Sequence, residues 1–362
     1  MKQKDRSISF LFPCVPSHAM GGFKVIYEQA NRLSGIGWKV YCVYPVICKI
    51  QKKTVKEQLG DIKRFFLRYF FIRHKNQEPN WFKTDKEIAH ILTFNLKQRN
   101  VPKTAFYCAT ALETSYFLKE YNVPEQNKLY YIQGFEAWGG HSESMVYNSY
   151  CFPLRKITIA PWLAERVRKV GQDSTLIPNG FDFDYFKLSN SIEKRSPYEI
   201  AMLYHRDVIK RCADAINALK IVKQKIPQLH VTMFGTPDKP DLPEWFSYYQ
   251  SPDKETHNKI YNTASVFVAA SESEGFGLTV GEAMICGCAV ACTDNGGFSM
   301  MVSNDRTGLL SPVYDCERLA ENIIKLIENN GLRIELAKNG NEFIQQFTWK
   351  KAFALFRKML ET

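Results

Sequence analysis

The chain has 362 residues, which is more than one hydrophobic core usually organises, so we expect two domains. Apolar residues make up 45% of the chain and charged residues 23%, a composition that excludes a disordered or collagenous protein. The net charge of +11 is uneven: residues 1–180 carry 27 Lys and Arg against 14 Asp and Glu, and residues 181–362 carry 21 against 23. The basic first half predicts a polyanionic or membrane-surface partner for that half.

The apolar runs are too short to cross a membrane. Residues 8–15 and 264–270 are among the longest, well below the ~18 residues that a spanning helix needs. The first run is broken at Pro13 and has no small-residue cleavage site, so we expect no signal peptide and a cytoplasmic protein. The ten cysteines are spread along the chain, and Cys286 and Cys288 lack a second ligand pair at zinc spacing. We therefore expect reduced, mostly buried thiols and no metal site.

Strand-sized apolar runs alternate with segments of helical periodicity along the whole chain. In the first half we expect strands over residues 7–14, 39–44, 104–108, 128–133 and 156–160, with a helix over residues 23–34. In the second half we expect strands over residues 199–204, 229–235, 265–270, 289–293 and 308–310, and closing helices over residues 316–329, 332–345 and 349–360. This alternation predicts two doubly wound, Rossmann-like α/β domains with parallel sheets.

The predicted domain boundary lies where polar residues and Pro197 interrupt the alternation, between residues 181 and 197. We assign residues 1–185 to the first domain and residues 186–345 to the second. Residues 346–362 form the closing helix.

One basic segment departs from the alternation of predicted strands and helices. Between Lys49 and Lys75 there are nine Lys and Arg against two acids, and Leu59, Ile62 and Phe66 recur at helical spacing. The pattern predicts a basic amphipathic helix. Such a helix either lies on an anionic membrane surface or packs its apolar stripe on a sheet, and the sequence leaves both alternatives open.

The most informative segment begins at Ser271. A predicted strand over residues 265–270 runs into a glycine-bearing turn, and a helix is expected to begin near Thr279. In doubly wound sheets ligands bind at the carboxyl ends of the strands. The amides of Gly277, Leu278 and Thr279 would be unpaired at the helix start and would bind an anion, for which a diphosphate is the natural candidate.

Residues 274–278 read Glu-Gly-Phe-Gly-Leu, and Glu282 follows eight residues after Glu274. This spacing resembles the Glu-x7-Glu motif of family-4 glycosyltransferases of GT-B fold. The resemblance implies that Glu274 contacts the hydroxyls of the donor sugar and that Glu282 binds the nucleotide ribose, since a carboxylate can accept two vicinal hydroxyls. A capping box of Thr279 and Glu282 is the structural alternative. Glu272 lies in the same loop, but the spacing favours Glu274.

Two further loops resemble the same family. Gly22 lies between the first strand and the first helix, where the family has a glycine loop near the donor phosphate, although any tight turn can use glycine there. Arg206 and Lys210 follow the first strand of the second domain and resemble the Arg and Lys that hold the diphosphate. Their spacing is shorter than usual, and Arg211 stands where the family has glycine, so Arg211 is a candidate substitute and a solvent-facing basic turn is the alternative.

The acceptor side departs from the family. Many members have a histidine in a loop after a late strand of the first domain, whereas this chain has Gln133 and Glu136 there. That pattern resembles a subgroup of polysaccharide-assembly enzymes that includes some rhamnosyltransferases. Gln133 and Glu136 are thus candidates for acceptor or donor-sugar contact, with His18 and His141 as further candidates.

The resemblance implies a retaining, metal-independent and cofactor-free glycosyltransferase. It would move a sugar from a nucleotide-sugar donor on the second domain to a glycan or lipid-linked acceptor on the basic first domain, across a cleft between them. The closing helix would cross back onto the first domain. Fixed cations and amides would stabilise the leaving diphosphate. The expected catalytic residues are Glu274, Lys210 and Arg206. The expected donor-binding residues are Gly22, Arg206, Lys210, Gly275, Phe276, Gly277, Leu278, Thr279 and Glu282.

With the basic segment, these expectations point to surface polysaccharide biosynthesis in the cytoplasm, at the inner face of the plasma membrane. Two alternatives remain. A GT-B sugar-nucleotide epimerase would use a similar cleft without an acceptor. A basic nucleic-acid-binding protein would show strongly salt-dependent affinity, but the sequence has no recognised motif for it, so we expect no nucleic-acid partner.

Overall fold

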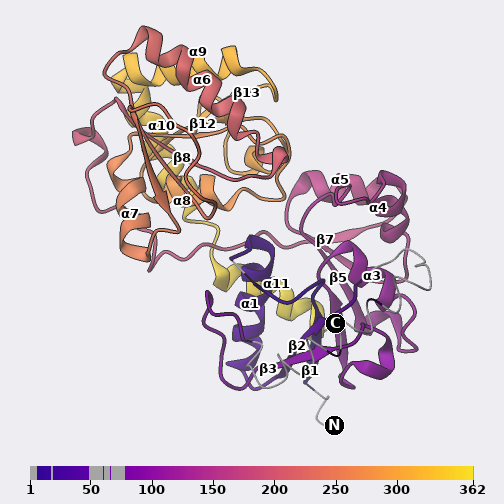
Figure 1. The fold of residues 1–362 in the computed structure, drawn as a ribbon. Coiled ribbons are helices and arrows are strands. Elements are labelled where there is room, and N and C mark those ends of the chain that lie inside the picture. Colours follow the sequence, from indigo (N-terminus) through magenta and orange to yellow (C-terminus); the bar gives the residue numbers. More distant parts are fainter. Residues whose placement is uncertain (1–5, 18, 49–59, 61–65, 67–77, 362) are drawn as a thin grey trace. The chain divides into compact units, whose positions relative to one another are not determined.

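The computed structural model describes residues 6–17, 19–48, 60, 66 and 78–361 (Figure 1). The chain divides into two compact units, the first formed by Met1–Asn179 and Lys350–Thr362 and the second by Gly180–Trp349. The predicted amphipathic helix between Lys49 and Lys75 lies outside the described residues, apart from Gly60 and Phe66.

The first unit is built on a seven-stranded parallel sheet in the order β3-β2-β1-β4-β5-β6-β7. Its strands are β1 (Ser7–Leu11), β2 (Lys39–Pro45), β3 (Ala89–Thr93), β4 (Phe106–Ala109), β5 (Lys128–Ile132), β6 (Arg155–Thr158) and β7 (Ser174–Leu176). Its helices are α1 (Gly21–Ser34), α3 (Leu112–Leu118), α4 (Glu143–Tyr150), α5 (Pro161–Arg168) and α11 (Trp349–Glu361). The strand order reverses beside β1, which makes this a doubly wound sheet.

The closing helix α11 packs on the first unit. The ring centroid of Phe356 lies 6.2 Å from that of Phe10 on β1 and 6.0 Å from that of Tyr131 on β5. Phe356 is fully buried. Burial of a phenylalanine stabilises by about 1.5–3 kcal/mol, so this ring anchors the end of the chain to a sheet formed by residues far away in sequence.

The second unit is built on a six-stranded parallel sheet in the order β10-β9-β8-β11-β12-β13. Its strands are β8 (Glu199–Leu203), β9 (His230–Gly235), β10 (Phe246–Gln250), β11 (Val266–Ala269), β12 (Ala289–Thr293) and β13 (Leu309–Ser311). Its helices are α6 (Cys212–Lys225), α7 (Lys254–Thr263), α8 (Leu278–Ile285), α9 (Cys316–Glu328) and α10 (Asn330–Ile344). The predicted α/β class and parallel sheets are confirmed.

Short 3-10 helices punctuate the loops: η1 (Gln98–Asn100), η2 (Glu125–Asn127), η3 (Ile192–Lys194), η4 (Val208–Lys210) and η5 (Phe298–Met300). In the second unit α6 and α9 lie together on one side of the sheet, and α7 and α8 lie on the other (Figure 1). The face of α9 that packs inward carries Leu319, Ile323 and Leu326, which are 0–1% exposed. Their spacing of three and four residues is that of an amphipathic helix covering a sheet.

Residues 180–195, which follow the first unit in the chain, are part of the second unit. Phe181 donates its amide to Phe347 O at 3.0 Å and pairs with Thr348 in a parallel bridge. Arg195 is 4% exposed and donates to the carbonyl oxygens of Ala264 at 2.9 Å and Tyr261 at 3.3 Å. These bonds fix residues 180–195 to the second unit, which explains why the structure divides at Asn179 rather than at the expected residue 185.

No helix among the described residues is both long and apolar enough to traverse a bilayer.

Gly281 provides a test of the packing around α8. We expect Gly281→Ala to lower the free energy of unfolding by about 1–3 kcal/mol, because the added Cβ would lie 2.1 Å from Cζ of Phe181, whose ring is buried. Gly331→Ala is the matched control, because Gly331 is also helical and the nearest atom to its Cβ would be Asn329 Oδ1 at 3.6 Å. The control should be neutral or stabilising by up to about 1 kcal/mol. Urea unfolding followed by circular dichroism measures both; equal stability of the two variants would contradict the packing.

Candidate functional site

A pocket opens in the second unit at the carboxyl ends of β8 and β11. These strands are neighbours at the point where the strand order reverses, which is where doubly wound sheets bind ligands. The polar side chains that line the pocket include Lys210, Ser271, Glu274 and Thr279. The loop after β8 supplies Lys210, and the loop after β11 supplies Ser271 and Glu274.

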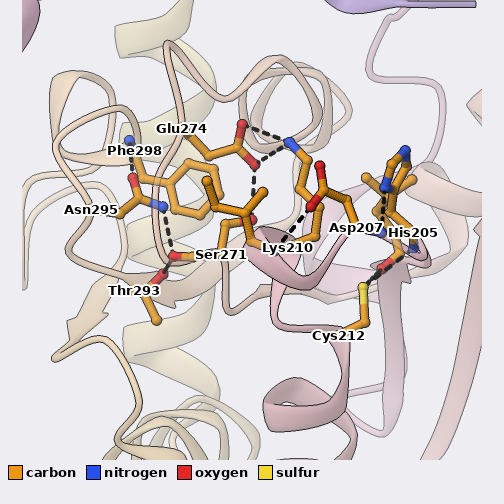
Figure 2. A network of polar contacts seen from close by, with 11 residues as sticks. His205, Asp207, Lys210, Cys212, Ser271, Glu274, Thr293, Asn295 and Phe298 are labelled. Atoms are coloured by element: carbon orange, nitrogen blue, oxygen red, sulfur yellow. Dashed lines mark hydrogen bonds and ion pairs between the residues drawn. The ribbon is translucent and has the colours of Figure 1, made fainter. Parts of the chain in front are cut away.

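Lys210 and Glu274 form an ion pair inside this pocket (Figure 2). Lys210 Nζ donates to Glu274 Oε1 at 2.7 Å and to Oε2 at 2.9 Å. The two side chains are 26% and 15% exposed, so the pair is largely shielded from water. Shielding strengthens the attraction and reduces screening by salt, in contrast to an ion pair on the open surface.

The loop that carries Glu274 is held by a set of side-chain hydrogen bonds (Figure 2). Ser271 Oγ donates to Glu274 Oε1 at 2.8 Å. The carbonyl oxygen of Ser271 accepts from Thr293 Oγ1 at 2.6 Å and from Asn295 Nδ2 at 2.9 Å. Asn295 Oδ1 in turn accepts from the amide of Phe298 at 3.0 Å. Side chains at the end of β12 and just after it therefore hold the loop that carries the Glu274 carboxylate.

Gly277 sets the start of α8. Its φ of 92° lies in the left-handed region, and a Cβ there would lie 2.5 Å from the ring of Phe298, so only glycine fits. Gly277 is the N-cap and the helix begins at Leu278, one residue before the predicted start at Thr279. Thr279 lines the pocket, so the first turn of α8, with its outward-pointing amides, adjoins the Lys210–Glu274 pair.

Glu282 lies on α8 and is 7% exposed. Its Oε2 accepts from the hydroxyl of Tyr261 at 3.4 Å. Burial, together with the nearby Glu282 carboxylate, raises the pKa of Tyr261 well above its usual range. Glu282 is not one of the described residues that line the pocket. The alternative capping box of Thr279 and Glu282 is wrong, because the N-cap is Gly277 and makes no side-chain capping bond.

The basic loop after β8 separates its three cations. Arg206 is 64% exposed and pairs with Asp238 at 3.1 Å, away from the described residues that line the pocket. Arg211 has φ 48° and ψ 36°, so the position requires the left-handed conformation that glycine adopts most easily. Its guanidinium bonds to Asp214 at 2.7 Å and lies over the ring of Tyr314 at 4.8 Å. Of the three cations, the structure brings only Lys210 to Glu274.

In the first unit Gly22 and Gln133 are brought together. Gly22 is the second residue of α1, which begins two residues earlier than expected. A Cβ on Gly22 would lie 3.4 Å from the side-chain amide of Gln133, an ordinary contact distance, so the two residues are neighbours. Gln133 Nε2 donates to the carbonyl oxygen of Thr110 at 3.4 Å. These groups lie at the carboxyl ends of β1, β4 and β5.

Glu136 and His141 lie beside the start of α3. The carboxylate of Glu136 accepts from the amide of Leu112, the first residue of that helix. His141 Nε2 lies 3.6 Å from Glu113 Oε1. Burial, opposed in part by the Leu112 amide, raises the pKa of Glu136 to about 8. His18 lies outside the described residues.

Sequence reasoning did not single out Ser271 and Asn295 as members of the site. Ser271 bonds to Glu274 only three residues further on, whereas the bond of Asn295 to the Ser271 carbonyl joins residues 24 apart in the chain. The signal that could have found them is their place, because each lies two residues after the end of a strand, Ser271 after β11 and Asn295 after β12.

Glu136 provides a pH-dependent test of this geometry. Because its pKa is raised on folding, the folded chain holds a proton that the unfolded chain loses between about pH 4.3 and pH 8, so ionisation destabilises the fold as pH rises through that window. Glutamine carries no charge and can still accept from Leu112. We expect Glu136→Gln to match the wild type near pH 4.5 and to melt higher at pH 8.5, by at least about 2 °C.

Glu87→Gln is the control for this test, because Glu87 is exposed and lies elsewhere in the first unit. The control should show no such trend between pH 4.5 and pH 8.5 in differential scanning calorimetry. A Glu136→Gln protein that melts lower than the wild type at pH 8.5 would contradict the geometry.

Comparisons with known proteins show what the chain is similar to. Residues 185–343 match the family model described as glycosyl transferases group 1. An uncharacterized glycosyltransferase of Methanocaldococcus jannaschii is 39% identical over 97 residues, 27% of this chain and 28% of that protein. A phosphatidyl-myo-inositol mannosyltransferase of Mycolicibacterium smegmatis is 24% identical over 208 residues, 54% of each chain. The chain thus matches about half or less of the length of these relatives.

Solved structures resemble the chain over nearly its full length. Sucrose-phosphate synthase from Thermosynechococcus elongatus has a TM-score of 0.72 at 18% identity and covers 98% of both chains. HepE of Anabaena, in complex with UDP-glucose, has a TM-score of 0.71 at 14% identity and covers 98% of this chain and 99% of its own. At such low identity the likeness shows the fold. Residues 185–343 of this protein therefore match the glycosyl transferases group 1 family, and the chain as a whole has the two-domain α/β fold of GT-B transferases.

Proposed function

We propose that this protein is a glycosyltransferase that takes a sugar from a nucleotide-sugar donor bound in the pocket of the second unit. The observation that carries the proposal is the meeting of Lys210 and Glu274 in one pocket beside the first turn of α8. A cation and helix amides suit a diphosphate, and a fixed carboxylate suits the hydroxyls of a sugar. HepE, whose solved structure holds UDP-glucose, supports a nucleotide-sugar donor for this fold.

In the proposed reaction Lys210 Nζ and the amides of the first turn of α8 hold the diphosphate. Negative charge grows on the leaving diphosphate as the glycosidic bond breaks, and groups fixed before the reaction stabilise that charge without reorganising. Glu274, held by Ser271, would accept hydrogen bonds from the sugar hydroxyls. Glu282 would contact the ribose, as the family resemblance implies. Because Lys210 and the amides supply positive charge, the proposal includes no metal and no cofactor.

The finer parts of the proposal concern the acceptor. We propose a retaining transfer to a glycan or lipid-linked acceptor bound by the first unit, near Gln133 and Glu136, in surface polysaccharide biosynthesis at the inner face of the plasma membrane. The basic first half of the chain supports an anionic or membrane-bound acceptor. The name of the mycobacterial relative, a phosphatidyl-myo-inositol mannosyltransferase, supports a lipid-linked one. Arg206, which pairs with Asp238, is given a minor role.

Nucleotide binding tests the donor site. Among UDP, GDP, dTDP and ADP, we expect at least one to raise the melting temperature of the wild type, because a ligand that binds only the folded state stabilises it. Lys210→Ala should weaken that binding about 10- to 100-fold, since it removes a charge-assisted hydrogen bond. Lys220→Ala, which removes an exposed lysine from α6, is the matched control and should bind like the wild type. A Lys210→Ala protein that binds as tightly as the control would contradict the assignment.

The fate of the donor separates a transferase from an epimerase. Incubated with the nucleotide sugar that binds, the wild type should leave the sugar configuration unchanged when no acceptor is present. With an acceptor, a retaining transferase should give a product with the anomeric configuration of the donor, which proton NMR coupling constants report. Equilibration of the sugar epimers without acceptor would favour the epimerase.

A further inference from the structure

We infer that Glu274 is a built-in competitor for Lys210, which makes the pocket discriminate against a nucleoside diphosphate that carries no sugar. The inference rests on the proposed function, since it concerns how the same pocket tells donor from spent nucleotide. It gives Glu274 a second role, besides contact with the sugar.

The geometry of the pair carries the inference. Both carboxylate oxygens of Glu274 accept from Lys210 Nζ, at 2.7 and 2.9 Å. A lysine ammonium has three donors, and the carboxylate occupies two of them. Any phosphate oxygen that binds Lys210 in the same way must therefore displace the carboxylate or approach it closely. Like charges at that distance repel, and the repulsion is strong because the two side chains are only 26% and 15% exposed.

The carboxylate is not free to move out of the way. Ser271 Oγ holds Glu274 Oε1 at 2.8 Å, and the carbonyl of Ser271 is fixed by Thr293 and Asn295. The backbone of Glu274 is also closely packed, because a Cβ on Gly297 would lie 2.4 Å from the Glu274 carbonyl oxygen. If a phosphate draws Lys210 away, the shielded Glu274 carboxylate keeps the Ser271 hydroxyl as its donor but loses its cation, which is unfavourable.

A sugar on the diphosphate removes this penalty. Its hydroxyls can donate to Glu274 and replace the ammonium that the diphosphate withdraws. A nucleoside diphosphate without a sugar offers no such donors, so it must compete with Glu274 for Lys210. After transfer the sugar has left the pocket and Glu274 binds Lys210 again. The nucleoside diphosphate that remains is then bound more weakly. The ion pair thus favours binding of the nucleotide sugar over binding of the nucleoside diphosphate, and it promotes release of the nucleoside diphosphate.

Glu274→Gln tests the inference. Glutamine keeps the shape of the side chain and its Oε1 can still accept from Ser271, but it carries no charge. We expect the variant to bind the nucleoside diphosphate that gave the largest melting shift among UDP, GDP, dTDP and ADP about tenfold more tightly than the wild type does, as measured by isothermal titration calorimetry. The corresponding nucleotide sugar should gain less or bind more weakly. The ratio of the two affinities should therefore shift toward the bare diphosphate.

Glu272→Gln is the matched control. Glu272 lies two residues away in the same loop and is exposed, so its substitution removes the same charge without touching the ion pair. Its binding should stay within about twofold of the wild type, because exposed charges are screened. An equal gain in the control would mean that net charge, and not the pair, sets the affinity, which would overturn the inference.

A double-substitution cycle with Lys210→Ala separates competition for the lysine from simple repulsion of phosphate. If Glu274 acts through Lys210, the gain from Glu274→Gln should vanish when Lys210 is already alanine. The same gain in both backgrounds would overturn the inference, as would wild-type or weaker diphosphate binding by Glu274→Gln. Either result leaves the proposed function standing as long as the wild type binds nucleotide. If neither the wild type nor Glu274→Gln binds any of the four nucleotides, both the inference and the proposed function fail.

Discussion

The ion pair between Lys210 and Glu274 depends on the way parallel strands deliver their loops. Lys210 follows β8 and Glu274 follows β11, and these strands are direct neighbours although more than sixty residues of chain separate the two side chains. Parallel pairing sends both strands toward the same edge of the sheet, so the two loops meet there. The strand order therefore places the two loops side by side, and the ion pair forms between the side chains that these loops carry.

Close packing of the backbone then limits how far the site can relax. Gly277 and Gly297 let the loop after β11 lie against Phe298 and against the next loop at distances that no other residue permits. Arg211 adopts a left-handed conformation at the start of α6, which costs an ordinary residue of order 1 kcal/mol, and its contacts with Asp214 and Tyr314 offset that cost. Lys210, immediately before it, is thereby held at the mouth of the pocket. A rigid frame of this kind keeps charged groups in place before a substrate arrives.

Much of the fold could be predicted from the sequence, because each buried strand is a run of apolar residues that local inspection detects. The strands β3, β7 and β10 escaped prediction, and few of their residues are buried: none in β7 (Ser174–Leu176), Thr93 alone in β3 and Phe246 alone in β10. Glu274 was found through motif spacing, and Lys210 through its place after the first strand of the second domain. The hydrogen bonds from Thr293 and Asn295 to the Ser271 carbonyl, and the pairing of Arg206 with Asp238, are contacts between distant segments, which local sequence does not encode.

The central claim is that the pocket at the ends of β8 and β11 binds a sugar-bearing diphosphate through Lys210 and Glu274. A crystal structure of the protein with a bound nucleotide sugar tests it most directly. The account predicts diphosphate oxygens within hydrogen-bond distance of Lys210 Nζ and of the first amides of α8, and sugar hydroxyls within hydrogen-bond distance of Glu274. A nucleotide sugar bound elsewhere, or bound with the Lys210–Glu274 pair still closed, would contradict it.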